Sequence, residues 1–152
     1  EAHDEMERDL RFRQYFMMGE NARYEGRMKE AVSAFQNALE IIPDDSIAIH
    51  RLCSCLLYLS RVNEARSCFS AIPEASCKNH LIQILDADIA IAENRIDHAA
   101  TCADKLSRID VGKNKDAVLI SDLHRRISEQ YKKRGQHKEA FQHYCIARKL
   151  SR

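Results

Sequence analysis

Residues that form tight turns are scarce in this chain, because only four of its 152 residues are Gly and two are Pro. All-β folds and Gly-rich nucleotide-binding folds need many more turn residues, so the sequence argues against both. Tryptophan is absent, and the densest apolar run, residues 56–59, is far shorter than the roughly 20 residues that cross a bilayer. Hydrophobic residues at 45% and charged residues at 31% favour a globular fold over disorder.

A disulfide framework is also not indicated, although the chain holds six cysteines. Their spacing is irregular, and most stand where a helix packs a small apolar residue against its neighbour. The first five residues, EAHDE, include no signal-type start and no initiator Met, so we expect a segment of a longer protein. We expect reduced cysteines and a cytoplasmic, reducing location.

Acidic residues exceed basic ones over most of the chain, whereas basic residues dominate its last part. Residues 1–110 hold 13 Lys and Arg against 19 Asp and Glu, whereas residues 111–152 hold 11 against 4. This distribution predicts an acidic leader and a basic tail rather than a surface that is basic throughout. With few aromatic residues among the basic ones, it disfavours nucleic acid as the partner.

Four short segments of the chain resemble one another, beginning at Gly26, Ser60, Asn94 and Gly135. Each places an alanine five residues later, and these alanines recur at spacings of 34, 34 and 41 residues. A fixed period of this length is typical of helical repeat proteins. The seven extra residues in the last spacing predict an insertion near 110–116.

The pattern inside each segment predicts a pair of amphipathic helices. Ala31 and Ala38 are seven residues apart and share one helical stripe, where small side chains let two helices approach closely while Phe35 fills the space between them. Pro43 ends the second helix, and Gly26 and Gly135 fit the tight turns within their helix pairs. A single pair cannot bury its apolar face, so successive pairs must stack. The predicted helices are residues 4–25, 28–42, 46–60, 63–72, 78–93, 96–109, 115–134 and 137–150.

The period and its residues resemble the tetratricopeptide repeat family. The first repeat matches best through Tyr15, Met18, Gly19, Ala31, Phe35, Ala38 and Pro43, whereas Ala22 stands where the family usually has Tyr. The resemblance covers residues 12–152 and implies an all-α, right-handed solenoid of four helix-turn-helix repeats. We expect one domain over 12–152, with repeats at about 12–45, 46–77, 78–110 and 115–152, after an acidic leader over 1–11 that extends the first helix.

The third repeat leaves its register open. A strict 34-residue alignment places Gln83 and Asp86 at apolar positions. A register shifted by one residue would place Ile82, Leu85 and Ile89 there instead. The first helix of this repeat is therefore uncertain by one residue.

No pattern in the sequence predicts catalysis or a bound cofactor. GxGxxG, P-loop and HExxH motifs are absent, and His137, His143 and Cys145 lack the spacing of zinc ligands. Asp86 and Asp88 are two residues apart, so they would not face each other on a helix, and we expect a solvated face there. The remaining histidines, His3, His50, His80, His98 and His124, are interpreted as surface or groove residues. We expect no enzyme activity, no cofactor and no metal site.

The resemblance implies a concave surface lined by the first helix of each repeat. A carboxylate clamp of the chaperone-binding type is disfavoured, because only Arg51 is basic among the five matching positions and Glu20 would repel a carboxylate. The candidate partner-binding residues are Phe16, Met17, Glu20, Tyr24, His50, Arg51, Tyr58, Ile84, Ile91, Arg125, Arg126, Lys132 and Lys133.

These residues predict an apolar, aromatic groove with a basic end. We interpret the chain as a non-catalytic protein-protein interaction module, an adaptor or scaffold that binds a partner helix or extended peptide. The alternative is a structural or self-associating segment of a larger scaffold, in which the groove is covered intramolecularly or by another copy.

Overall fold

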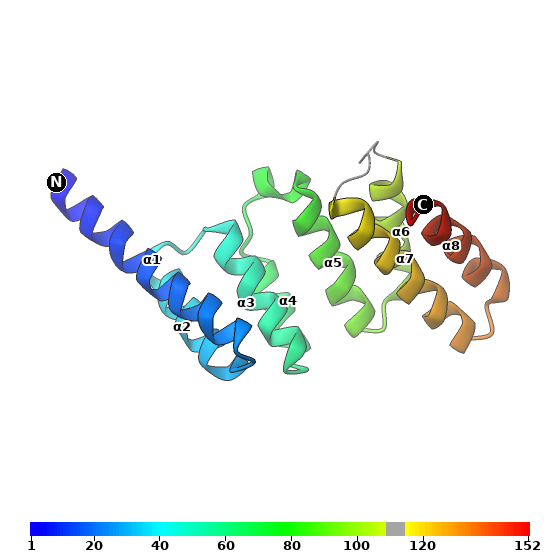
Figure 1. The fold of residues 1–152 in the computed structure, drawn as a ribbon, viewed down its shortest axis with the longest axis horizontal. Helices are drawn as coiled ribbons and strands as arrows, with labels where there is room; N and C mark the ends of the chain where they lie inside the picture. The colour runs from blue at the N-terminus through cyan, green and yellow to red at the C-terminus, as the bar shows by residue number, and fades with distance from the viewer. Residues whose placement is uncertain (109–114) are drawn as a thin grey trace. The chain divides into compact units, whose positions relative to one another are not determined.

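A computed structural model describes residues 1–108 and 115–152 (Figure 1), so most of the predicted insertion near 110–116 lies outside the described residues. All regular structure in the described residues is helical. The predicted helices are confirmed, and their ends differ from the prediction by at most three residues. The helices are α1 (Ala2–Tyr24), α2 (Met28–Ile41), α3 (Ser46–Tyr58), α4 (Val62–Phe69), the short 3₁₀ helix η1 (Glu74–Lys78), α5 (His80–Ala92), α6 (Ile96–Ser107), α7 (Lys115–Lys133) and α8 (His137–Leu150).

The helices form two compact units, which we call unit 1 (residues 1–76) and unit 2 (residues 77–152). Unit 1 holds the pairs α1–α2 and α3–α4, and unit 2 holds the pairs α5–α6 and α7–α8. The two helices of each pair lie side by side in Figure 1. One domain over 12–152 with a leader over 1–11 stays a prediction. No helix in the described part of the chain has the length and apolar character needed to span a membrane.

The same backbone turn joins the two helices of every pair. Gly26, Ser60, Asn94 and Gly135 all adopt positive φ angles between 61° and 79°. After the first of these residues, the amide of Arg27 donates to the carbonyl of Ala22 at 2.8 Å, and the other three turns contain the same bond at 2.8–2.9 Å. This bond satisfies a carbonyl that the end of the helix leaves over. The turns predicted at the two glycines are confirmed, and the other two segments reach the same conformation without glycine.

Small residues bring α1 and α2 together in unit 1. Ala31, Phe35 and Ala38 are fully buried, as the helical stripe predicts. A Cβ atom on Gly19 would lie 2.6 Å from Cε1 of Phe35, closer than van der Waals contact allows. The Phe35 ring therefore occupies the space that the glycine leaves on α1.

The structure resolves the register of the third repeat. Ile82, Leu85 and Ile89 are at most 4% exposed, whereas Gln83 and Asp86 are half-buried. The ends of α5 nevertheless lie 34 residues after those of α3, so the backbone keeps the strict period and only the set of buried side chains differs. Asn79 caps α5 through a 2.9 Å hydrogen bond from the amide of Leu81.

Candidate functional site

A charged cluster joins the first helices of the two repeats in unit 1. The Glu20 carboxylate on α1 accepts hydrogen bonds from Nε and Nη2 of Arg23, each at 3.2 Å. The same carboxylate lies 3.2 Å from Nε of Arg51 on α3. All three side chains are less than one third exposed. Two arginines share one carboxylate, so the cluster keeps one positive charge.

His50 extends this cluster without adding charge. Its Nδ1 accepts a hydrogen bond from Nη1 of Arg51 at 2.9 Å. Burial and then the neighbouring Arg51 lower the pKa of His50 to about 4, so the imidazole is neutral near pH 7. Nε of Arg51 is buried and finds no hydrogen-bond acceptor of suitable geometry among the described residues. One donor of the cluster is therefore unsatisfied.

Large apolar side chains flank the cluster and face solvent. Tyr24 is 81% exposed, Tyr58 is 70% exposed and Met17 is 56% exposed. Phe16 is half-buried, because its ring packs edge-on against Phe35 with the centroids 5.6 Å apart. We call the predicted residues of unit 1 the α1–α3 face: Phe16, Met17, Glu20, Tyr24, His50, Arg51 and Tyr58.

The predicted apolar residues of unit 2 lie elsewhere. Ile84 is 7% exposed and belongs to the hydrophobic core of unit 2, and Ile91 packs against that core while partly buried. These two side chains therefore contribute mainly to the fold of unit 2.

The predicted basic residues of unit 2 are largely neutralised within the unit. Arg126 on α7 donates to Asp88 on α5 at 2.6 Å and to Asp122 at 3.0 Å. Arg125 pairs with Asp122 and, at 3.4 Å, with Glu129. Two positive charges are thus balanced by three carboxylates of the same unit.

Two lysines remain as the basic end. Lys132 and Lys133 are exposed at the C-terminal end of α7 and form no ion pair with any described residue. Cations at this end of a helix also complement the helix dipole, so their position needs no ligand to explain it.

Sequence reasoning misplaced several polar residues of unit 2. His124, expected at the surface or in the groove, is fully buried, and its Nδ1 lies 2.9 Å from Nδ1 of His143, which is 6% exposed. Asp86 and Asp88 do not face each other, as predicted, but both side chains are less than one third exposed rather than on a solvated face. No local pattern marks these contacts, because each joins different helices.

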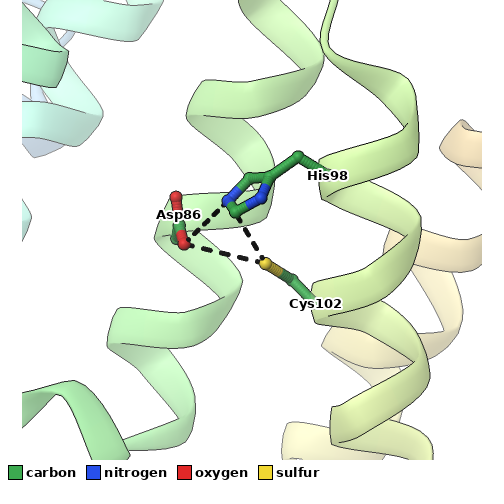
Figure 2. Close-up of side chains that lie close together, drawn as sticks. All are labelled: Asp86, His98 and Cys102. Atoms are coloured by element: carbon green, nitrogen blue, oxygen red, sulfur yellow. Dashed lines mark hydrogen bonds and ion pairs between the residues drawn. The ribbon is translucent and has the colours of Figure 1, made fainter.

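Three groups in the described residues bring together side chains that could ligate a metal. The first joins Asp86, His98 and Cys102 (Figure 2), and the second joins Asp104 to the two buried histidines of α7 and α8. The third lies on the exposed start of α1. The first group matters most chemically, because it combines oxygen, nitrogen and sulfur donors.

Comparison with known proteins supports the fold. The tetratricopeptide repeat family profile matches residues 22–89. MamA 41-end from Desulfovibrio magneticus RS-1 superposes with a TM-score of 0.76 at 17% identity, and the match covers 92% of this chain and 75% of that chain. A MamA RS-1 ArsTM double mutant gives 0.74 at 17% identity with the same coverage.

A third solved structure, MamA MSR-1 C2, gives a TM-score of 0.67 at 18% identity, covering 90% of this chain and 75% of that chain. No curated protein matches the chain significantly. At these identities the likeness shows the fold alone, and it confirms an all-α helical repeat of the solenoid class.

Proposed function

We propose that the chain, whose residues 22–89 match the tetratricopeptide repeat family profile, is a non-catalytic interaction module that binds a segment of another protein on the α1–α3 face. The observation that carries the proposal is the exposure of Met17, Tyr24 and Tyr58 beside the Glu20–Arg51 pair. Apolar side chains so exposed on two adjacent helices are a typical docking surface.

The chemistry of the face defines the partner. Tyrosines offer large apolar contact area with a polar tip and are enriched where binding energy concentrates. The single net positive charge of the Glu20, Arg23 and Arg51 cluster favours an acidic side chain among apolar ones. The unsatisfied Nε of Arg51 supplies a further donor, if the Glu20 side chain moves on binding. We therefore expect a short helix or extended segment with apolar residues next to an Asp or Glu.

The cysteines bear on the location that we propose. None of the six forms a disulfide, and burial raises the pKa of the Cys53 thiol to about 12, so this thiol stays protonated and unreactive. This chemistry supports a cytoplasmic, reducing location.

Selection of peptides tests the proposed site directly. A displayed library of random linear peptides is panned on the intact chain, and the recovered peptides are measured against the double variant Tyr24→Glu/Tyr58→Glu. We expect recovered peptides to hold apolar residues beside an acidic one, and to bind the variant at least about 100-fold more weakly, because two anchors become repulsive charges.

A matched control distinguishes the α1–α3 face from other exposed aromatics. Phe141 and Tyr144 on α8 are 66% and 47% exposed, so the double variant Phe141→Glu/Tyr144→Glu changes equivalent residues in unit 2. It should bind the peptides as the unaltered chain does, and circular dichroism should show all three proteins equally helical. Equal binding by the Tyr24/Tyr58 variant would contradict the proposal.

Self-association is the alternative use of the same face. Light scattering of the intact chain across a range of concentrations gives its mass. A mass that rises with concentration, and that the Tyr24/Tyr58 variant returns to that of a monomer, would assign the face to contacts between copies rather than to a foreign peptide.

A further inference from the structure

We propose that Asp86, His98 and Cys102 form a zinc-binding site in the α5–α6 pair. The three side chains converge from two helices, as Figure 2 shows, with Asp86 on α5 and the other two on α6. Oδ2 of Asp86 lies 3.2 Å from Nε2 of His98 and 3.7 Å from Sγ of Cys102. Sγ of Cys102 lies 3.7 Å from Nε2 of His98. Each side chain thus aims one ligand atom at a common point.

These separations match one face of a zinc tetrahedron. Zinc binds carboxylate oxygen and imidazole nitrogen at about 2.0–2.2 Å and thiolate sulfur at about 2.3 Å. Ligand atoms of a tetrahedron with those bond lengths stand about 3.3–3.7 Å apart. The observed 3.2, 3.7 and 3.7 Å agree with this pattern, including the longer separations to sulfur. An ion can therefore enter without rearrangement of the helices.

The fold explains why these residues meet. His98 and Cys102 are four residues apart on α6 and share one face of that helix. Asp86 reaches them from α5, where Leu85 and Ile89 are buried in the core and Asp86 is half-buried. The side chain of His98 is 38% exposed and that of Asp86 is 22% exposed, so an ion can reach the donors from solvent.

The same geometry argues against a catalytic relay. In a nucleophile–His–acid relay, the acid contacts one ring nitrogen and the nucleophile contacts the other. Here both the carboxylate and the thiol approach Nε2 of His98. Ligand atoms that surround one ion also lie close to one another, so two groups near the same ring nitrogen fit an ion site better than a relay.

Binding follows from simple coordination chemistry. The Sγ–H bond of Cys102 breaks, its proton passes to the buffer, and the thiolate electron pair forms the bond to the metal. His98 binds through the Nε2 lone pair and therefore keeps its hydrogen on Nδ1, while Asp86 binds as the carboxylate. A donor set of oxygen, nitrogen and sulfur suits zinc, and water fills the fourth position in zinc sites with three protein ligands.

The buried histidine cluster is the weaker candidate. Nε2 of His124 donates to the carbonyl of Ala103 at 3.2 Å, which leaves Nδ1 to accept a hydrogen bond from Nδ1 of His143. His124 is fully buried and its ring nitrogens are both engaged. A metal there would have to replace a hydrogen bond inside the core, whereas at Asp86 and His98 it would replace one at a partly exposed edge.

Cobalt and zinc titrations of the intact, reduced chain test the site. Co²⁺ should bind with a stoichiometry of one and produce a thiolate charge-transfer band with tetrahedral visible bands, and Zn²⁺ should displace it. Zn²⁺ should also raise the thermal unfolding midpoint, because it binds only the folded arrangement. Cys102→Ser should remove the charge-transfer band, and His98→Gln should weaken binding by more than roughly tenfold.

Matched variants make the result specific. Cys77→Ser and Cys145→Ser change exposed cysteines of the same unit and should leave both the band and the affinity unchanged. Asp86→Asn provides a third variant if either of the first two fails to fold by circular dichroism. The proposal is overturned if the unaltered chain shows no thiolate band, if Cys102→Ser and His98→Gln bind as tightly as the unaltered chain, or if the band disappears only with Cys77→Ser or Cys145→Ser.

Discussion

Unit 1 and unit 2 fill the same repeat pattern with different side chains. In the first repeat, the buried Phe35 ring lies over Gly19, and the small Ala22 stands where the family usually has Tyr. In the fourth repeat, the residue equivalent to Phe35 is Tyr144, which is 47% exposed, and a buried Tyr131 takes the place of Ala22. The aromatic ring has moved from the second helix of the pair to the first. The pattern therefore preserves packed volume rather than residue identity.

Polar groups also differ between the units. Unit 1 keeps its cluster of Glu20, Arg23 and Arg51 on a partly exposed face. Unit 2 instead stacks the buried rings of His124 and His143, with centroids 5.1 Å apart. Polar side chains join neighbouring helices in both units, but those of unit 1 lie on a partly exposed face and the two histidines of unit 2 are buried.

The largest expected difference in stability lies between substitutions at Phe35 and at Tyr144, the equivalent aromatic residues of the first and fourth repeats. Phe35→Ala should lower the free energy of unfolding by about 3–5 kcal/mol, because it leaves a cavity over Gly19. Tyr144→Ala should cost less than about 1 kcal/mol, since half of that ring already contacts water. Urea unfolding followed by circular dichroism measures both, and similar losses would show that the two repeats pack alike.

Close packing at Gly19 gives the next effect. Gly19→Val should lower the free energy of unfolding by about 1–3 kcal/mol, because its Cβ would lie 2.6 Å from Phe35. Phe35→Leu made in the same chain should recover part of this loss, since it removes the clashing ring atoms. If the double variant loses as much free energy of unfolding as the two single variants together, the strain does not come from contact with the Phe35 ring.

The buried histidine predicts a dependence on pH. Burial and then His143 lower the pKa of His124 from 6.5 to about 4. As the pH falls, the imidazole of His124 is therefore protonated in the unfolded chain before it is protonated in the folded chain. The free energy of unfolding decreases as the pH drops from about 6.5 toward 4. Between pH 7.5 and pH 5 the loss from this residue should be about 2 kcal/mol.

Substitution of His124 separates its contribution to the pH dependence of stability from that of His50 in unit 1. His50 in unit 1 also has a pKa lowered to about 4, so it destabilises the folded chain over the same range. His124→Gln should remove the part of the pH dependence that comes from His124, and leave the parts that come from His50 and from His143, whose pKa burial also lowers. An unchanged pH profile in this variant would exclude His124 as its source.

Two neighbouring arginines give the smallest pair of effects. Arg126→Gln should cost about 1–2 kcal/mol, because Asp88 on α5 would keep a partly buried carboxylate without its cation. Burial already raises the pKa of Asp88, which shows the cost of charging it there. Arg125→Gln should cost less than about 0.5 kcal/mol, since its exposed pairs lie within α7. Thermal unfolding compares the two, and equal shifts would contradict a bridging role for Arg126.

The repeat period predicted more of the fold than of the candidate site. Helix ends follow local signals, so the segments beginning at Gly26 and Gly135 could be placed from sequence. Tyr24 and Tyr58 were predicted at the α1–α3 face and are exposed there, whereas Ile84 was predicted in a groove and lies in the core. The difference arises because spacing along α5 does not fix how that helix is rotated against its neighbours, and one residue position corresponds to about 100° of rotation.

The amino-acid sequence determined that this chain forms helix pairs, where each pair turns and which small residues let its helices approach. These properties depend on spacing along a single helix and on neighbours a few residues away. Only the tertiary structure decided that Arg51 shares Glu20 with Arg23, and that Asp86 meets His98 and Cys102. Such contacts depend on how each helix is rotated about its own axis against its neighbours, and packing of whole cores sets that rotation.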